Sequence, residues 1–476
     1  MSKFEHPDNH YTQQVKQLIE QVFPKDNGLG SVYEDARHYF TLTPDLQEHV
    51  AELQAKLNGV DKTSKNGGAN EQLKKKLKLA KAKLENERLE RIDRLESVAL
   101  KIIALCEDES YEETQLLSSK FLGTIMLLTR GPEGNFAKIH QRLKPLYKAA
   151  LALRLTDKIL EGNLISDPYL AEMKDALLRF KGNRHWQERW QTEIAVPVIA
   201  CALLQDIGLQ APEAKEILFG PDNDLDEFRV LDNEPRKALL KINYSRTMDY
   251  LKHGLGIPGY VGNDKDERDQ FIRRHKAVNH FMQMVMKDAF ISKSGLGEII
   301  KIPQIYVSIV LSTKPDYTRK SLPKGYMLIE QLAKKGALNN KLAEAFINIV
   351  GYFPLGFGIT YIPQNEKGID REQYECAIVT RLNPKSPAEP ICRPVTRNLT
   401  YISFGNDEVI KKSTNLFFPT NRKKLMRIGR ERLMEIMSQL SDNFTPDAID
   451  DLVPSFWEPA DYFSFKKNQN LWNKAR

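Results

Sequence analysis

The stretch Leu203-Leu204-Gln205-Asp206-Ile207-Gly208 ends the longest apolar run of the chain, residues 194–204. That run is too short to cross a bilayer and contains Pro197, so it predicts a buried helix in the core of a helical protein. Gly208 stands where a glycine often closes a helix C-terminus in the left-handed conformation. On this interpretation Asp206 caps the helix or hydrogen-bonds inside a helical bundle.

A metal site is the alternative interpretation of Gln205 and Asp206. Neighbouring histidine and aspartate side chains bind a divalent cation well, and the bound cation acidifies a water molecule. Glutamine is a poor substitute for the histidine, because its amide oxygen is uncharged and weakly basic. Gln205 therefore predicts a metal site that is weakened or lost.

Length and composition limit the class of protein. A chain of 476 residues exceeds what one core usually holds, so two or three structural units are expected. The formal charge of +7 is a small excess on a heavily charged chain, and it suits phosphate-bearing ligands without indicating nucleic acid. No Rossmann glycine motif, phosphate-binding loop or hydrolase nucleophile elbow occurs in a fitting context, which excludes most nucleotide kinases, dehydrogenases and α/β-hydrolases.

Cysteine usage and the N-terminus predict a cytoplasmic location. The four cysteines are far apart and form no CxxC pair, which argues against a zinc site and against a disulfide framework. The N-terminus is polar, and the sequence has neither an apolar signal region nor a transmembrane segment. We therefore expect a soluble cytoplasmic protein.

The first part of the chain is expected to be helical. Residues 1–58 predict a helical segment, and the polar, glycine-rich residues 59–70 predict a flexible linker. Residues 71–106 predict one long charged helix, which opens a helical region that extends to residue 180. Its heptad spacing is broken between Leu84 and Ile92, which are eight residues apart. Dimerisation with a second copy and an intramolecular hairpin arm against the next helix explain this pattern equally well.

Further motifs follow Asp206 in order along the chain. A helix-forming stretch at 336–347 is followed by Val350-Gly351-Tyr352-Phe353-Pro354-Leu355-Gly356, and residues 375–379 and 394–396 then predict two strands. This order, over about residues 185–402, resembles the HD-GYP family, a bacterial subgroup of the HD phosphohydrolase superfamily. In that family the apolar helix ends in His-Asp-Ile-Gly, and the helical domain ends in Gly-x-Tyr-Pro-x-Gly.

The resemblance implies a mainly α fold: a multi-helix HD-type bundle over residues 181–358, preceded by an N-terminal helical region with a long charged helix and followed by a small C-terminal β extension over residues 359–420. Residues 421–476 then predict a C-terminal helix and an aromatic tail. We expect the basic helix 421–440 to dock on the domain, with binding to nucleic acid or a membrane surface as the alternative. The tail from Asp450 packs on its own domain or presents a partner-binding surface.

The metal ligands of the family are where this chain departs from it. The corresponding positions carry Gln205, Asp206, Asn243, His280 and Gln304. Of these, only Asp206 and His280 keep a side chain that binds metals well. Two ligands cannot fix a bimetal centre in which each metal needs about four to six donors. The resemblance therefore implies a domain that has kept its helices and lost its metal chemistry.

The spacing of the other histidines does not provide a replacement metal site. A rearranged single-metal site at Asp206 would need imidazoles from His185, His253, His275 or His280. His275 and His280 are five residues apart, so they point roughly 140° apart around a helix and do not converge on one ion. Surface or ordinary hydrogen-bonded histidines are the simpler interpretation.

Six cations flank the segments that correspond to the family's active site. They are Arg246, Arg273, Arg274, Lys314, Arg319 and Lys320. Such side chains can hold a phosphate-bearing ligand, for example a cyclic dinucleotide, without cleaving it. Solvated surface charge is the alternative.

We therefore expect a catalytically inactive HD-GYP-like bacterial signalling or regulatory protein. It would bind such a ligand or a protein partner without a cofactor, and it would self-associate through residues 71–106. One alternative is an active metal-dependent phosphohydrolase or cyclic-di-GMP phosphodiesterase that uses Fe, Mn or Zn and replaced ligands. Another is a scaffold that binds only protein.

Overall fold

The fold is mainly α with a small C-terminal β extension, as predicted from the sequence. The computed structural model describes residues 7–25, 30–59, 67–129, 136–291, 294–398, 400–425, 434–435, 438–439 and 454–473. Within these residues, no helix is both long enough and apolar enough to span a membrane.

Four N-terminal helices come first along the chain: α1 (His10–Val22), α2 (Val32–Thr41), α3 (Thr43–Asn58) and α4 (Gly67–Cys106). Side-chain caps fix the starts of the first two, because Asn9 accepts a hydrogen bond from the Thr12 amide and Ser31 accepts one from the Glu34 amide. The predicted linker 59–70 is shorter than expected, since α4 already begins at Gly67, and residues 60–66 lie outside the described residues.

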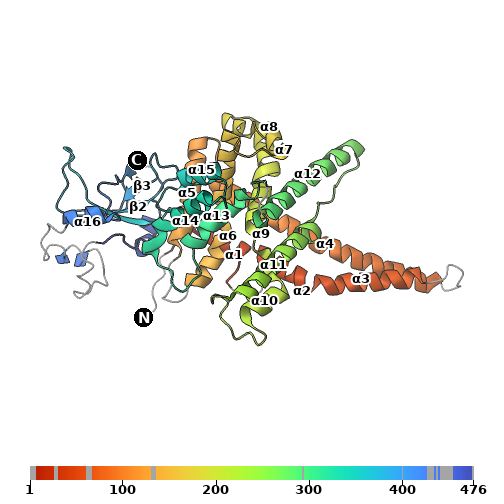
Figure 1. Cartoon of the computed structure of the whole chain (residues 1–476). Coiled ribbons are helices and arrows are strands. Elements are labelled where there is room, and N and C mark those ends of the chain that lie inside the picture. The colour runs from red at the N-terminus through yellow and green to blue at the C-terminus, as the bar shows by residue number, and fades with distance from the viewer. Residues whose placement is uncertain are drawn as a thin grey trace.

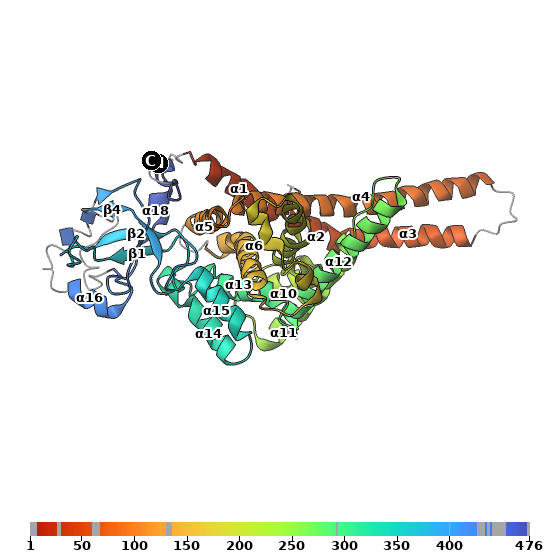
Figure 2. The same cartoon turned by 90° about the horizontal axis from the view of Figure 1, so that it is seen from above.

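Helices α3 and α4 form an antiparallel hairpin that projects from the body of the molecule (Figures 1 and 2). Leu53 of α3 and Leu77 of α4 are buried along this arm, and Lys81 donates a hydrogen bond to Gln54 Oε1. The structure thus contains an intramolecular hairpin, but the partner of α4 along this arm is the preceding helix α3 and not the next helix, as the sequence had suggested. Self-association through residues 71–106 stays a prediction.

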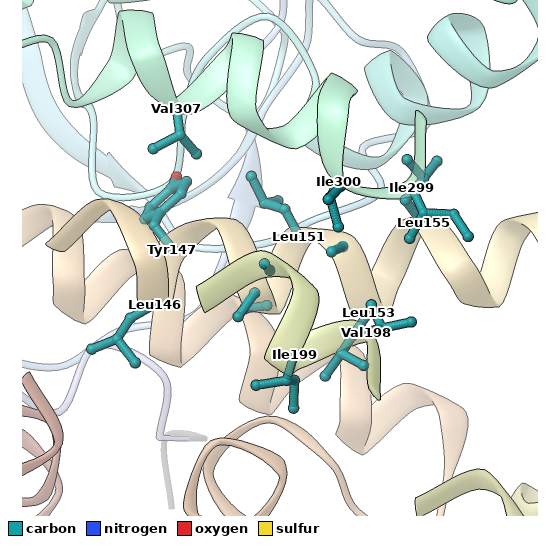
Figure 3. Close-up of a cluster of buried hydrophobic side chains, with 14 of the residues drawn as sticks. Leu146, Tyr147, Leu151, Leu153, Leu155, Val198, Ile199, Ile299, Ile300 and Val307 are labelled. Carbon is teal, nitrogen blue, oxygen red and sulfur yellow. The ribbon is translucent and has the colours of Figure 1, made fainter. Parts of the chain in front are cut away.

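Helix α6 (Phe136–Gly162) forms the centre of the bundle. Every residue from Pro145 to Asp157 is buried, so this part of the helix is covered on all sides. Helices α9 (Val196–Leu204) and α13 (Glu298–Val310) pack against it, and Figure 3 shows Tyr147 and Leu151 of α6 with Ile199 of α9 and Val307 of α13 in this core.

The remaining helices surround this centre. They are α5 (Tyr111–Leu127), α7 (Pro168–Glu172), η1 (Ala176–Lys181), α8 (Arg184–Arg189), η2 (Trp190–Ala195), η3 (Ile207–Gln210), α10 (Pro212–Phe219), α11 (Asn233–Asp249), η4 (Tyr250–Leu255), α12 (Lys265–Phe290), η5 (Arg319–Lys324), α14 (Gly325–Lys334) and α15 (Asn340–Val350). The N-terminal half of α12 extends away from the bundle and is largely exposed (Figure 1).

The β extension is a four-stranded antiparallel sheet of order β1-β2-β3-β6, with a small second ladder of β4 and β5. The strands are β1 (Gly358–Tyr361), β2 (Glu375–Val379), β3 (Ile391–Pro394), β4 (Thr396–Arg397), β5 (Thr400–Tyr401) and β6 (Glu408–Val409). The register pairs Gly358 with Ile378 and Ala377 with Pro394. The predicted strand 375–379 is confirmed, whereas the predicted strand 394–396 is divided between the end of β3 and the start of β4.

The aromatic tail packs on the β extension and the bundle. Tyr462 and Phe463 of α18 (Ala460–Phe463) are buried, and so is Trp472, whose indole N–H donates to the Thr380 carbonyl at 2.9 Å. A short 3₁₀ turn, η7 (Lys466–Asn468), lies between them. Upstream, α16 (Pro419–Leu425) begins the predicted basic helix 421–440, most of which lies outside the described residues.

One contiguous apolar core runs through most of the molecule. It includes Val15 of α1, Ala99 of α4, Leu151 of α6, Phe346 of α15 and Ile359 of β1. The N-terminal helices, the bundle and the first strand are therefore packed as one body. The site described next lies where α6, α9, α11 and α13 approach one another.

Candidate functional site

The turn after α9 is held by close contact with α11. The Gly208 amide donates a hydrogen bond to Thr247 Oγ1 at 3.1 Å. A Cβ atom at Gly208 would lie 2.3 Å from the Asn243 carbonyl oxygen, a distance that no side chain tolerates. The helix does end here, but the prediction of a left-handed glycine cap is wrong, because Gly208 is not among the described residues with positive φ. Glycine is needed for the close approach of α11.

Four of the five predicted ligand positions meet at this turn. The Asn243 amide donates to the Gln205 carbonyl oxygen at 3.3 Å, and the Gln304 amide donates to Asp206 Oδ2 at 3.1 Å. The residues of these pairs are 38 and 98 positions apart in the chain. His280 is different: it is exposed on α12 and makes no hydrogen bond or ion pair with these four residues in the described structure.

A lysine of α6 is the cation next to Asp206. Lys148 Nζ lies 3.5 Å from Asp206 Oδ2, and its side chain is only 2% exposed, whereas that of Asp206 is 35% exposed. Burial lowers the pKa of Lys148, and the neighbouring Asp206 carboxylate opposes that shift. Asp206 therefore accepts hydrogen bonds from an ammonium and an amide. These contacts agree with the interpretation that Asp206 hydrogen-bonds inside the bundle.

Lys144 lies one helical turn before Lys148 and faces the same site. Its Nζ is 3.5 Å from Thr313 Oγ1, in the loop after α13. Burial lowers the pKa of Lys144 to about 8; Asp206 opposes the shift, and the positive charge of Lys148 adds to it. Lys144 is thus a cation whose charge is held less firmly than that of a surface lysine.

His140 continues the same stripe of α6 by one further turn. Its Nδ1 is 2.6 Å from the Ser312 carbonyl oxygen, and the ring is fully buried between Phe136 and Tyr317. Burial lowers the pKa of His140 to about 4; the hydrogen bond to Ser312 opposes this, while the charges of Arg319 and Lys144 add to it. We infer a neutral imidazole that donates from Nδ1. Its Nε2 has no partner among the described residues.

Two buried amide oxygens at the site also lack hydrogen-bond donors within the described part of the chain. They are Oε1 of Gln205 and Oε1 of Gln304. The orientation of Gln304 follows from its contact with Asp206, because a carboxylate accepts only from the N–H side of an amide. The site therefore combines two ammonium groups, one carboxylate and two free acceptors.

This donor set does not fit a bimetal centre. Asp206 supplies the one carboxylate, Gln205, Asn243 and Gln304 supply neutral amides, and the Lys148 ammonium already lies beside the carboxylate. Across the described ranges, no group of three or more His, Cys, Asp or Glu side chains is placed to hold a metal ion. Hard and first-row cations favour charged oxygen or imidazole donors over amides.

The predicted phosphate-binding cations do not gather around this site. Arg246 pairs with Glu213, Arg274 pairs with Glu193 at 3.2 Å, and Arg319 pairs with Glu458. The other three are exposed: Arg273 on α12, Lys314 after α13 and Lys320 in η5. Lys314 adjoins the site, since its backbone amide donates to Ser312 Oγ next to Thr313, and Arg319 is close enough to His140 for its charge to lower the pKa of that imidazole.

The sequence analysis missed the residues of α6. His140, Lys144 and Lys148 recur every four residues, which places them on one face of a helix. Lys148 is followed by Ala149-Ala150-Leu151-Ala152-Leu153, a run that predicts burial. A lysine at the start of such a run, in register with two other polar side chains, was the available signal.

Similarity to known proteins does not identify this site. The chain matches no family model, no curated protein and no solved structure. Its function therefore has to follow from the contacts of Lys148, Asp206 and Gln304.

Proposed function

We propose that this chain is a bacterial signalling or regulatory protein built on an HD-GYP-like helical domain, which binds a ligand or a protein partner without hydrolysing a phosphodiester. The arrangement of Gln205, Asp206, Asn243 and Gln304 supports this proposal, because residues aligned with separate ligand positions lie together. A random set of polar residues from three helices has no reason to converge on one turn.

The observation that carries the proposal is the ammonium of Lys148 beside Asp206. It supplies the positive charge that a metal would otherwise supply to this carboxylate. A divalent ion bound at Asp206, about 4 Å from that ammonium, would meet a repulsion of roughly 8 kcal/mol at an effective dielectric constant of about 20. The neutral amides of Asn243 and Gln304 offer little compensation, so no metal-activated water is expected.

The ligand belongs to the phosphate-bearing class under this proposal, and a cyclic dinucleotide is one candidate. The excess of ammonium over carboxylate groups favours an anion at the site. A protein partner, self-association through residues 71–106 and a cytoplasmic location are further parts of the proposal. No contact in the described structure specifically favours an active phosphohydrolase.

Elemental analysis of the purified full chain, combined with assays on bis-p-nitrophenyl phosphate and cyclic-di-GMP, tests the proposal. We expect substoichiometric Fe, Mn and Zn and no turnover of either substrate. Stoichiometric metal together with turnover would establish the active enzyme instead.

The variant Gln205→His sharpens this test. We expect it to remain inactive, since Lys148 keeps its charge beside Asp206 and the amides of Asn243 and Gln304 remain. Activity after this single change would show that the other ligands had been assigned to the wrong residues.

A further inference from the structure

We propose that Lys144 and Lys148, together with the Thr313 hydroxyl, form a binding site for the phosphate group of a ligand. This inference rests on the proposed function, since it requires a site that binds without cleaving. It assigns the anion to α6, on residues other than the six cations that the sequence indicated.

The two ammonium groups are poorly satisfied by the protein itself. A lysine ammonium has three donor hydrogens. Within the described residues, Lys148 has one partner, Asp206 at 3.5 Å, and Lys144 has one, Thr313 Oγ1 at 3.5 Å. Both distances are at the outer limit of a hydrogen bond. Largely buried cations with so few contacts need further acceptors, which an oxyanion provides.

The charges at the site also favour an anion. Lys144 and Lys148 face the same side of α6, and Asp206 is the carboxylate whose charge acts on both of their pKa values. One negative charge does not balance two positive charges. A phosphate monoanion would bring the net charge of these groups to zero and would raise the lowered pKa of Lys144, because it favours the charged amine.

The environment of Asp206 limits where the phosphate can lie. Asp206 Oδ2 is occupied by Lys148 and Gln304, and its negative charge repels an anion. The phosphate is therefore placed on the Lys144 and Thr313 side, where a hydroxyl can donate to it. The unpaired Oε1 of Gln304 can then accept from a hydroxyl or amino group of the same ligand. Lys144 and Thr313 are both partly exposed, so this side of the site is open to solvent.

Isothermal titration of the metal-free full chain with inorganic phosphate at pH 7, and separately with cyclic-di-GMP, tests this inference. We expect saturable binding of at least one probe. Binding of phosphate alone would indicate a small phosphate ligand, and tighter binding of cyclic-di-GMP would indicate a dinucleotide. The variant Lys144→Gln should weaken binding at least about tenfold, the usual effect of losing a charged hydrogen bond.

Lys138→Gln is the matched control, because Lys138 is an exposed lysine of the same helix. It should change the affinity by less than about twofold. Equal affinity in the Lys144→Gln variant and the wild type, or no binding of either probe at millimolar concentration, would overturn the inference.

Amine labelling of the wild type covers the case in which Lys144→Gln fails to fold. Phosphate should slow acetylation of Lys144, measured by mass spectrometry, at least about tenfold and leave Lys138 unaffected. Equal rates with and without phosphate would overturn the inference. A metal-free chain that hydrolyses nothing and binds neither probe contradicts this inference but leaves a non-hydrolysing protein that binds a protein partner, whereas metal-dependent turnover contradicts the proposed function.

Discussion

At the scale of single residues, the account rests on a buried lysine beside a partly exposed aspartate. The side chain of Lys148 is 2% exposed and that of Asp206 is 35% exposed. Asp206 therefore tolerates the loss of Lys148 better than Lys148 tolerates the loss of Asp206. A buried ammonium without a partner is costly, whereas Asp206 without Lys148 keeps solvent and the Gln304 amide as partners.

We predict that Asp206→Ala destabilises the fold more than Lys148→Met does. Asp206→Ala should cost about 2–3 kcal/mol, at or below the low end of the range for a broken buried pair, because Asp206 is partly solvated. Lys148→Met should change stability by less than about 1 kcal/mol, since the methionine fills a similar volume without a charge to desolvate. Urea denaturation measures both, with Lys138→Met as the neutral control. The opposite order would contradict the assigned burial of this pair.

The neutral state of His140 gives a prediction on pH. Its folded-state pKa of about 4 lies below the ordinary value of 6.5, so the unfolded chain binds the proton more readily. The contribution of His140 to the free energy of unfolding is therefore fully present above pH 6.5 and is lost as the pH falls towards 4. Between pH 7 and pH 4.5, the wild type should lose about 2.5 kcal/mol more than His140→Gln, measured by urea denaturation. Equal losses would show that His140 is not buried in the neutral form.

At the scale of elements, the sequence predicted where the helices lie along the chain better than it predicted which helices pack against one another. The end of α9 after Leu204, the long helix α4 and the strand β2 follow from local periodicity and composition. The role of Gly208 does not follow from the local sequence. This position needs glycine because Asn243 of α11, 35 residues later in the chain, packs against it. Lys148 was missed for the same reason: its partner lies on another helix, and no local pattern names that partner.

The contact between the α9 turn and α11 predicts a large effect of Gly208→Ala. The added methyl group would lie 2.3 Å from the Asn243 carbonyl oxygen, so α11 has to move. We expect a loss of about 2–4 kcal/mol in the free energy of unfolding. Gly259→Ala is the control, since a Cβ atom there meets nothing within 4 Å. A thermal melt that shows no difference between the two variants would mean that α11 does not approach Gly208 this closely.

At the scale of the whole molecule, segments from opposite ends of the chain are packed together. The Asn9 amide donates to Gln469 Oε1 at 2.7 Å, and the Trp472 ring covers Gly123 of α5. The sequence left open whether the aromatic tail packs on its own domain or presents a partner-binding surface, and it could not indicate contacts between residues about 460 positions apart. Such contacts depend on the path of the chain through the fold.

We predict that the tail stabilises the molecule as a whole. Trp472→Ala removes a ring that is 2% exposed and leaves the Thr380 carbonyl without its donor, so it should cost about 3–5 kcal/mol. Phe404→Ala removes a ring that is 79% exposed and should be nearly neutral. Differential scanning calorimetry should show one shifted transition for Trp472→Ala. An unchanged melting temperature would contradict the docking of the tail.

The central claim, that the ammonium of Lys148 keeps metal ions from binding at Asp206, is tested most directly by calorimetric titration of Mn²⁺ into the metal-free full chain. We predict no stoichiometric binding tighter than about millimolar, because the ion would lie next to the charge of Lys148. One or two ions bound with micromolar affinity, and lost in Asp206→Ala, would contradict the claim.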